Sequence, residues 1–444
     1  MAAHIQLSDH FTYGRLIRFT LPSVVMMLFT SIYVIVDGWF VSNFVGKTSF
    51  AALNLIYPFI QILGSLGFII GAGGSALVAK IMGEGHKEKA QSTFTLLVIV
   101  SVVMGIVLAL FGQYFLKDVA ISFGADGQLL HDSVLYGRII LCSLVAFVLQ
   151  NVFQSFFIVA EKPALGLAVM MIAGVSNIFF DYLFIVTMNM GLQGAALATV
   201  TSQCLGALLP IIYFAVPNSG LLRFRRAVFS IKAIAQTFMN GLSEFMTNVS
   251  ASVISMLYNY QLMRYIGEDG VAAYGIMVYV NFLFMAVFYG YVMGCSPVVS
   301  YHYGADNKAE MHNVLKKSLI ITTVVSVVLT VLAEVLANTI ADTFVGYDES
   351  LCLLTRNAFR IYCIAFLFAG FNIFVSAFFT ALNNGVVSAV VSFGRTFVFE
   401  VLAVILLPML LGIDGIWAAI ICAEVAAVLL SGTFLCTKRK KYGY

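Results

Sequence analysis

The chain has 444 residues, of which 61% are hydrophobic and only 10% are charged, and its mean hydropathy is +0.98. Soluble domains carry roughly 25% charged residues, so this composition excludes a soluble protein and predicts an all-α polytopic membrane protein. The formal net charge is only +3, and the basic residues are divided by side of the membrane rather than gathered in one patch, which argues against a nucleic-acid partner.

Twelve apolar runs of about 20 residues or more, separated by short polar or glycine-marked turns, predict twelve transmembrane helices. They cover residues 15–40, 51–79, 91–116, 131–159, 164–188, 193–216, 236–264, 271–299, 316–340, 353–381, 386–411 and 413–436. The runs are continuous rather than alternating, which excludes a transmembrane β-barrel.

Lys and Arg are distributed unequally between the two sides of the predicted membrane. The ends and loops on one side carry Arg15, Arg18, Lys80, Lys87, Lys89, Lys162, Arg223, Arg225, Arg226, Lys232, Lys308, Lys316, Lys317 and the tail 438–441. The other side carries Lys47, Lys117, Arg138, Arg264, Arg356 and Arg360. The positive-inside rule therefore predicts that both termini are cytoplasmic.

The two halves of the chain repeat one another. Sliding the chain by 221 residues brings Gly46 onto Gly267, Gly73 onto Gly294 and Gly83 onto Gly304. Six spans per half make the repeats parallel, which predicts two pseudo-symmetric six-helix lobes with a substrate cleft between them. We expect an amino-terminal lobe at 1–216, a cytoplasmic linker at 217–235 and a carboxy-terminal lobe with a basic tail at 236–444. A duplication retained for stability alone is the alternative.

Polar side chains at similar depths in the amino-terminal half form a candidate ion site. They are Asp37, Tyr136, Asn177, Asp181 and Thr199, and Asn177 lies one helical turn before Asp181. A carboxylate in the bilayer costs about 2.5–3.5 kcal/mol, so it should face the bundle interior or a hydrated cavity. Two such acids can bind and release a proton, or hold a cation. A buried aspartate that serves packing alone is the alternative.

The carboxy-terminal half contains the membrane-embedded charges Glu244, Arg395, Glu400 and Glu424. The leading interpretation is a structural ion pair between Arg395 and either Glu244 or Glu424. Glu400 occupies almost the position in span 11 that Asp181 has in span 5, so it either lines a substrate cavity or is satisfied by its neighbours. Phe, Tyr and Met side chains along a cleft would suit flat, lipophilic cations.

Two features of the first spans bear on helix geometry. Pro22 removes a backbone hydrogen bond from span 1, which either lets that helix bend or leaves a static kink. The glycines of span 2 predict close helix packing; they are Gly64, Gly67, Gly71, Gly73 and Gly74.

Enzymatic and ATP-driven functions find no support in the motifs. No glycine-rich loop is followed by Lys-Ser/Thr, so we expect transport to be driven by an ion gradient. The six histidines fall in termini, loops or span ends, and the seven cysteines show no paired spacing. We therefore expect no cofactor, no metal site and no enzyme.

The motifs together resemble the MATE (multidrug and toxic compound extrusion) transporters over nearly the full chain, and are most similar to the bacterial MepA-like branch. The stretches that carry the resemblance are 36–46 (VDGWFVSNFVG), 71–80 (GAGGSALVAK), 161–163 (EKP), 177–181 (NIFFD), 194–199 (GAALAT) and 241–245 (GLSEF). The resemblance implies a two-lobed antiporter of the bacterial inner membrane that exports diverse, often cationic drugs. We expect the lipid-embedded chain to work as a monomer.

The resemblance also implies roles for particular residues. The amino-lobe cluster of proton-coupled members maps onto Asp37, Tyr136, Asn177, Asp181 and Thr199, and their span 1 proline maps onto Pro22. Sodium-coupled relatives carry an acid in span 10, where this chain has Asn372, which weighs against a carboxy-lobe sodium site. The predicted coupling ion is H⁺. The alternatives are Na⁺ coupling and a flippase for a lipid-linked saccharide, which would need a more cationic central cavity.

Overall fold

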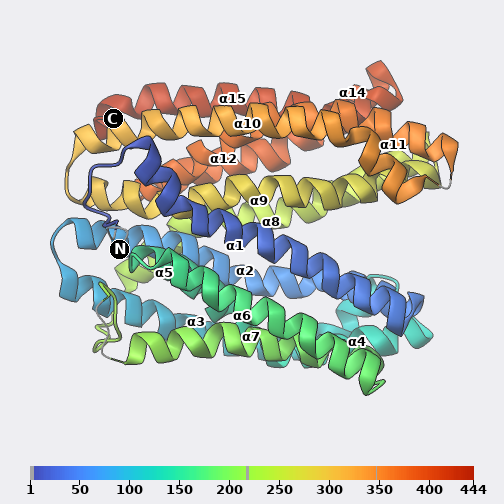
Figure 1. Ribbon diagram of the computed structural model, residues 1–444, viewed down its shortest axis with the longest axis horizontal. Helices are drawn as coiled ribbons and strands as arrows, with labels where there is room; N and C mark the ends of the chain where they lie inside the picture. Colours follow the sequence, from blue (N-terminus) through green and yellow to red (C-terminus); the bar gives the residue numbers. More distant parts are fainter. Residues whose placement is uncertain (1–4, 217–219, 347) are drawn as a thin grey trace.

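The computed structural model describes residues 5–216, 220–346 and 348–444, without the side chain of Lys47. The first residues of the predicted linker, 217–219, lie outside this range. The described chain is built from helices and contains no β-strand, and the long helices run along a common axis in two groups (Figure 1). The predicted all-α membrane fold is therefore confirmed.

Six spans form the amino-terminal lobe, and three of them are interrupted. The helix α1 (Tyr13–Phe40) continues into the π-helical η1 (Val41–Val45), and α6 (Pro163–Asp181) continues into the π-helical η2 (Tyr182–Thr187). One predicted span is a pair of helices, α4 (Gly127–Cys142) and α5 (Leu144–Val159), bent by 54°. The uninterrupted spans are α2 (Lys47–Gly83), α3 (Lys87–Ser122) and α7 (Gly191–Ala215).

The carboxy-terminal lobe repeats this order. Its uninterrupted spans are α8 (Ile231–Tyr265), α9 (Glu268–Gly304), α10 (Lys308–Val345) and α15 (Ile413–Tyr442). One span joins α11 (Glu349–Tyr362), the 3₁₀ turn η3 (Cys363–Ala365) and α12 (Phe366–Ala381). Another joins α13 (Gly385–Phe393), the π-helical η4 (Gly394–Phe399) and α14 (Glu400–Leu411).

The helix α8 is the least apolar of the twelve spans. Length and hydropathy alone identify up to eleven spans in the described chain, and α8 is not among them. Its 35 residues reach about 50 Å, enough to cross a bilayer. Its polar side chains include Asn240, Glu244 and Asn248, and it packs on α2 of the other lobe, so much of it is shielded from lipid. With α8, the predicted count of twelve is confirmed.

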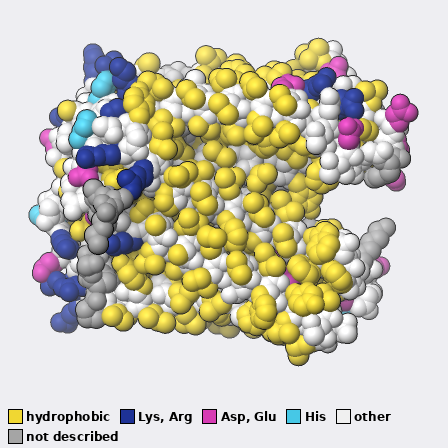
Figure 2. All heavy atoms as spheres, viewed as in Figure 1, with side chains coloured by type: hydrophobic (Ala, Val, Ile, Leu, Met, Phe, Trp, Pro, Cys, Tyr) yellow, Lys and Arg dark blue, Asp and Glu magenta, His cyan; other side chains and the backbone are white. Residues whose placement is uncertain are grey.

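The two ends of the molecule differ in charge and shape. Both termini lie at one end, where Lys and Arg side chains gather; we call it the basic end (Figures 1 and 2). At the opposite, notched end, a deep recess separates the two lobes (Figure 2). The lobes are therefore closed against each other at the basic end and apart at the notched end.

Glycines allow the helix backbones to touch where the lobes meet. A Cβ atom at Gly73 would overlap the carbonyl oxygen of Thr237. A Cβ at Gly83 would overlap that of Tyr301, and a Cβ at Gly304 would overlap that of Lys80. The predicted close packing of the span 2 glycines is confirmed, and part of it occurs between the lobes.

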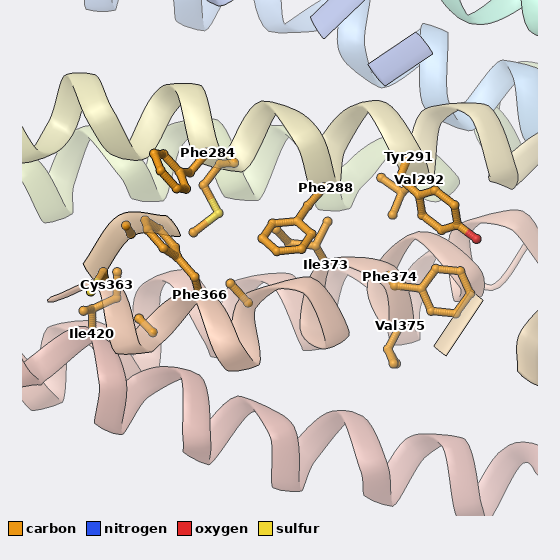
Figure 3. Close-up of a cluster of buried hydrophobic side chains, with 14 of the residues drawn as sticks. Phe284, Phe288, Tyr291, Val292, Cys363, Phe366, Ile373, Phe374, Val375 and Ile420 are labelled. Carbon is orange, nitrogen blue, oxygen red and sulfur yellow. The ribbon is translucent and has the colours of Figure 1, made fainter. Parts of the chain in front are cut away.

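Each lobe also has an aromatic core of its own. In the carboxy-terminal lobe, Phe284 and Phe288 of α9 face Phe366 and Phe374 of α12 (Figure 3). The rings of Phe284 and Phe366 stack with centroids 5.2 Å apart. In the amino-terminal lobe, Phe94 lies at the centre of a separate cluster. Dense packing within each lobe favours movement of the lobes as units.

Candidate functional site

Two carboxyl groups, one fully buried and one partly buried, meet inside the amino-terminal lobe. Asp37 lies one turn before the end of α1, and Asp181 is the last residue of α6 and is fully buried. The side chain of Asp37 interacts at short range with the side chains of Asp181 and Asn177. Both oxygens of Asp181 lack a hydrogen-bond donor in the described part of the chain. Two ionised carboxylates cannot donate to each other, because both can only accept. One proton between them turns the contact into a hydrogen bond.

Tyr136 and Thr199 complete the predicted set. Tyr136 of α4 is only 4% exposed and interacts electrostatically with both acids and with Thr199 of α7, whose hydroxyl donates to the carbonyl oxygen of Ala195. Four helices thus bring the five predicted residues to one place. Depth along the spans had placed them at one level, and the structure adds that they face one another.

Two phenols that the sequence analysis did not select join this cluster. Tyr33 on α1 and Tyr57 on α2 both interact electrostatically with Asp37. Tyr33 lies one helical turn before Asp37, so the (i, i+4) spacing was a usable signal. Tyr57 comes from another helix, so no spacing in the sequence indicated that it lies near Asp37. Its side chain is 39% exposed, so the cluster reaches the surface on the α2 side.

A π-helical segment lies close to each of three acids, Asp37, Asp181 and Glu400. The π-helical η2 begins directly after Asp181, η4 ends directly before Glu400, and η1 begins four residues after Asp37. Such π turns occur frequently at functional sites, because they free backbone groups and re-aim side chains. In both lobes, therefore, the helix backbone is irregular close to a membrane-embedded acid.

Arg395 in the carboxy-terminal lobe is paired with one acid. Its Nε and Nη2 atoms each lie 2.7 Å from Oε1 of Glu424. Asn372 donates to Oε2 of Glu424 at 2.7 Å, and Ser431 donates to Asn372 at 3.0 Å. The partner of the arginine is therefore Glu424, with Asn372 as a supporting amide.

The other two acids of this lobe lie in different surroundings. Glu244 lines a small cavity together with Tyr289, Asn372 and Arg395. Glu400 interacts electrostatically with the phenols of three other helices, namely Tyr258, Tyr274 and Tyr362. Neither acid forms part of the Asp37 cluster. Within the described ranges, no three His, Cys, Asp or Glu side chains are grouped so that they could hold a metal ion.

Pro22 lies within α1, which is helical without a break from Tyr13 to Phe40. At this level α1 contacts α9 closely, since Cβ atoms at Gly290 and Gly294 would crowd Val24 and Thr20. Bending at Pro22 stays a prediction.

Removing the arginine should destabilise the protein strongly. Arg395→Ala would leave Glu424 buried without a counter-ion, and we expect a loss of about 3–5 kcal/mol in unfolding free energy. Thermal unfolding in detergent measures this loss. The matched control is Arg356→Ala, whose ion pair with Asp342 is partly exposed and should contribute about 0–1 kcal/mol. Equal effects of the two substitutions would contradict the importance of the buried pair.

This chain is similar to known proteins along most of its length. The model of the MatE family matches residues 22–183 and 245–406, one segment in each half. Multidrug export protein MepA of Staphylococcus haemolyticus is 24% identical over 420 residues, covering 94% of this chain and 92% of the relative. MepA of Staphylococcus aureus strain MRSA252 is 21% identical, and the match covers 94% of this chain and 92% of that protein.

Solved structures agree in fold. One captures the outward-facing conformation of a multidrug resistance MATE family transporter, with a TM-score of 0.93 at 21% identity, covering 100% of this chain and 99% of the other. A MATE structure in the straight conformation gives a TM-score of 0.93 at 20% identity, with coverage of 100% and 99%. The two-lobed arrangement is thus common to this chain and to those transporters.

Proposed function

The chain belongs to the MatE family, and from this premise we propose that it is a secondary active antiporter that exports lipophilic, often cationic drugs in exchange for H⁺. The observation that carries the proposal is the contact between Asp37 and Asp181 inside the amino-terminal lobe. In the described part of the chain, no Lys or Arg forms an ion pair with either acid, so the pair depends on a mobile cation for charge balance. The multidrug export relatives support the substrate class.

The proposed orientation places the basic end in the cytoplasm of a bacterial inner membrane, in accordance with the positive-inside rule. The notched end then faces outward, and drugs leave through the recess between the lobes (Figure 2). Entry of drugs from the cytoplasm requires the lobes to separate at the basic end. This is alternating access by two parallel repeats.

The coupling step follows from the charge of the pair. A proton that arrives from outside binds between Asp37 and Asp181 and removes one negative charge from the lobe. The lobe then holds a cationic drug less tightly, and the drug dissociates outward. In this proposal Asn177, Tyr136 and Thr199 form the polar shell that can hydrogen-bond to the two carboxyl groups as their charge changes.

The carboxy-terminal lobe supports H⁺ over the alternatives. Glu424 is already paired with Arg395. Sodium-coupled relatives carry an acid in span 10, where this chain has Asn372, which also donates to Glu424. A flippase for a lipid-linked saccharide would need free cationic groups in its cavity, whereas Arg395 is the one arginine deep in a described span and it is already paired. Glu424 and Asn372, which could bind Na⁺, and Arg395, which could bind an anionic headgroup, are thus bonded to one another.

Purified protein in lipid vesicles tests the proposal with a fluorescent lipophilic cation as the drug. We expect an imposed proton gradient to drive its movement and an imposed sodium gradient to have no effect. Movement driven by sodium alone would replace H⁺ by Na⁺ in the mechanism. Movement that is indifferent to both gradients would exclude ion coupling.

A further inference from the structure

The segment before α1 connects the two lobes at the basic end. Residues 5–12, which we call the hook, run from the amino-terminal lobe to α10 of the other lobe and back into α1 (Figure 1). The side chains of Leu7 and Phe11 are fully buried. The hook is therefore packed into the molecule rather than lying loosely on it.

Both ends of the hook are fixed to the amino-terminal lobe. The backbone N–H of Leu7 donates to Oε1 of Glu161 at 2.6 Å, in the turn between α5 and α6. At the other end, Thr12 caps α1 by accepting from the N–H of Arg15. The Glu-Lys-Pro motif singled out in the sequence thus supplies an anchor that the transport site does not use.

The middle of the hook is held by the carboxy-terminal lobe. Glu310 of α10 accepts from the backbone N–H of Phe11 at 2.8 Å and contacts Nδ1 of His10 at 2.7 Å. The carbonyl oxygen of Phe11 accepts from Lys317 at 2.7 Å and from Asn313 at 3.0 Å. Most of these bonds involve an ionised group, which makes them about twice as strong as neutral ones.

The ring of Phe11 adds an apolar anchor to this polar one. It packs edge-on against Phe19 of α1, with centroids 5.9 Å apart, and edge-on against His302 of α9 at 6.4 Å. The ring therefore sits between a helix of each lobe. When the lobes separate at the basic end, α1 must move away from α9 and α10, and the bonds of Phe11 and His10 to α10 must break.

We propose that the hook is a latch that stabilises the state closed at the basic end, with Glu310 as its receptor on the opposite lobe. The proposal rests on the alternating access of the proposed function. It assigns no part of drug or ion binding to the hook. Loss of the latch changes the balance between the two states, and leaves the sites within each lobe as they are.

Spin labels on the two lobes measure this balance directly. We would replace the exposed cysteines Cys142, Cys422 and Cys436, then label Lys87→Cys on α3 and His312→Cys on α10, both exposed at the basic end. Pulsed electron–electron distance measurements give the populations of the closed and separated states. In the intact chain we expect the short distance to dominate.

Two variants weaken the latch from opposite sides. Glu310→Gln removes the charge of the receptor, and Phe11→Ala removes the buried ring while leaving α10 unchanged. We expect each to raise the ratio of separated to closed molecules about tenfold or more. The matched control is Glu84→Gln at the same end, because its ion pair with Lys80 joins two residues of the amino-terminal lobe and its loss should not affect the ratio.

The outcomes separate the latch from the transport function. If both variants keep the distance distribution of the intact chain, the hook is not a latch, whatever the protein transports. The measurement uses neither drug nor ion gradient, so a failure of drug export in vesicles would leave its result unaffected.

Discussion

Asp181→Asn is expected to abolish proton-driven drug export, with a fall in the coupled rate on the order of a hundred-fold or more. An amide cannot take up and release a proton, so residues 37 and 181 can no longer share a proton between two carboxyl groups. Asp37→Asn should have the same effect, because the two acids interact directly with each other. Drug movement into vesicles under a proton gradient measures the loss.

The control for this prediction is an acid of the same lobe that is already satisfied. Asp132 accepts hydrogen bonds from Ser49 at 2.8 Å and from Gln128 at 2.7 Å. Asp132→Asn should therefore retain export. Size-exclusion profiles show whether each variant is folded. Near-normal efflux by a folded Asp181→Asn or Asp37→Asn variant would refute the role proposed for that acid.

Much of the architecture was predictable because a bilayer imposes simple rules. Spanning helices need long apolar runs, and a tandem repeat fixes six spans per lobe. The depth of Asp37 and Asp181 followed from the rise of 1.5 Å per residue. Even α8 was found, since its run from 236 to 264 contains at most two consecutive polar residues, too few to form a loop.

Contacts between helices were not predictable from one sequence. Rotation about the helix axis decides whether Tyr57 faces Asp37, and spacing within α2 carries no information about α1. The same limit left Glu244 and Glu424 as equal candidates for pairing with Arg395. The break at Ser143 between α4 and α5 also gave no signal, because the apolar run continues through it.

The receptor of the hook was hidden for a different reason. Asn307 accepts from the N–H of Glu310, so this pair looks like an ordinary helix start in the sequence. The contact with Phe11 joins residues that are 299 positions apart. The local sequence around Glu310 is therefore accounted for by the helix start alone and gives no sign of the contact with the hook.

Gly304→Leu is expected to stop export by preventing closure of the basic end. A side chain at this position would overlap the carbonyl oxygen of Lys80, and a backbone atom in a helix cannot move aside as a flexible side chain does. The clash exists only when α9 lies against α2, so the variant should fold and remain in the separated state. Gly83→Leu should act in the same way, through the carbonyl oxygen of Tyr301.

The spin-labelled pair that reports on the basic end measures the shift, which we expect to be about tenfold to a hundredfold toward the separated state. Gly275→Leu is the matched control, because it lies in the same helix, and a Cβ there meets no atom within 4 Å. It should keep both the closed state and export. Since the steric block acts at the lobe contact alone, both Asp181 and Asp37 would remain intact in Gly304→Leu. Normal export by that variant would therefore contradict closure at the basic end as a required step of transport.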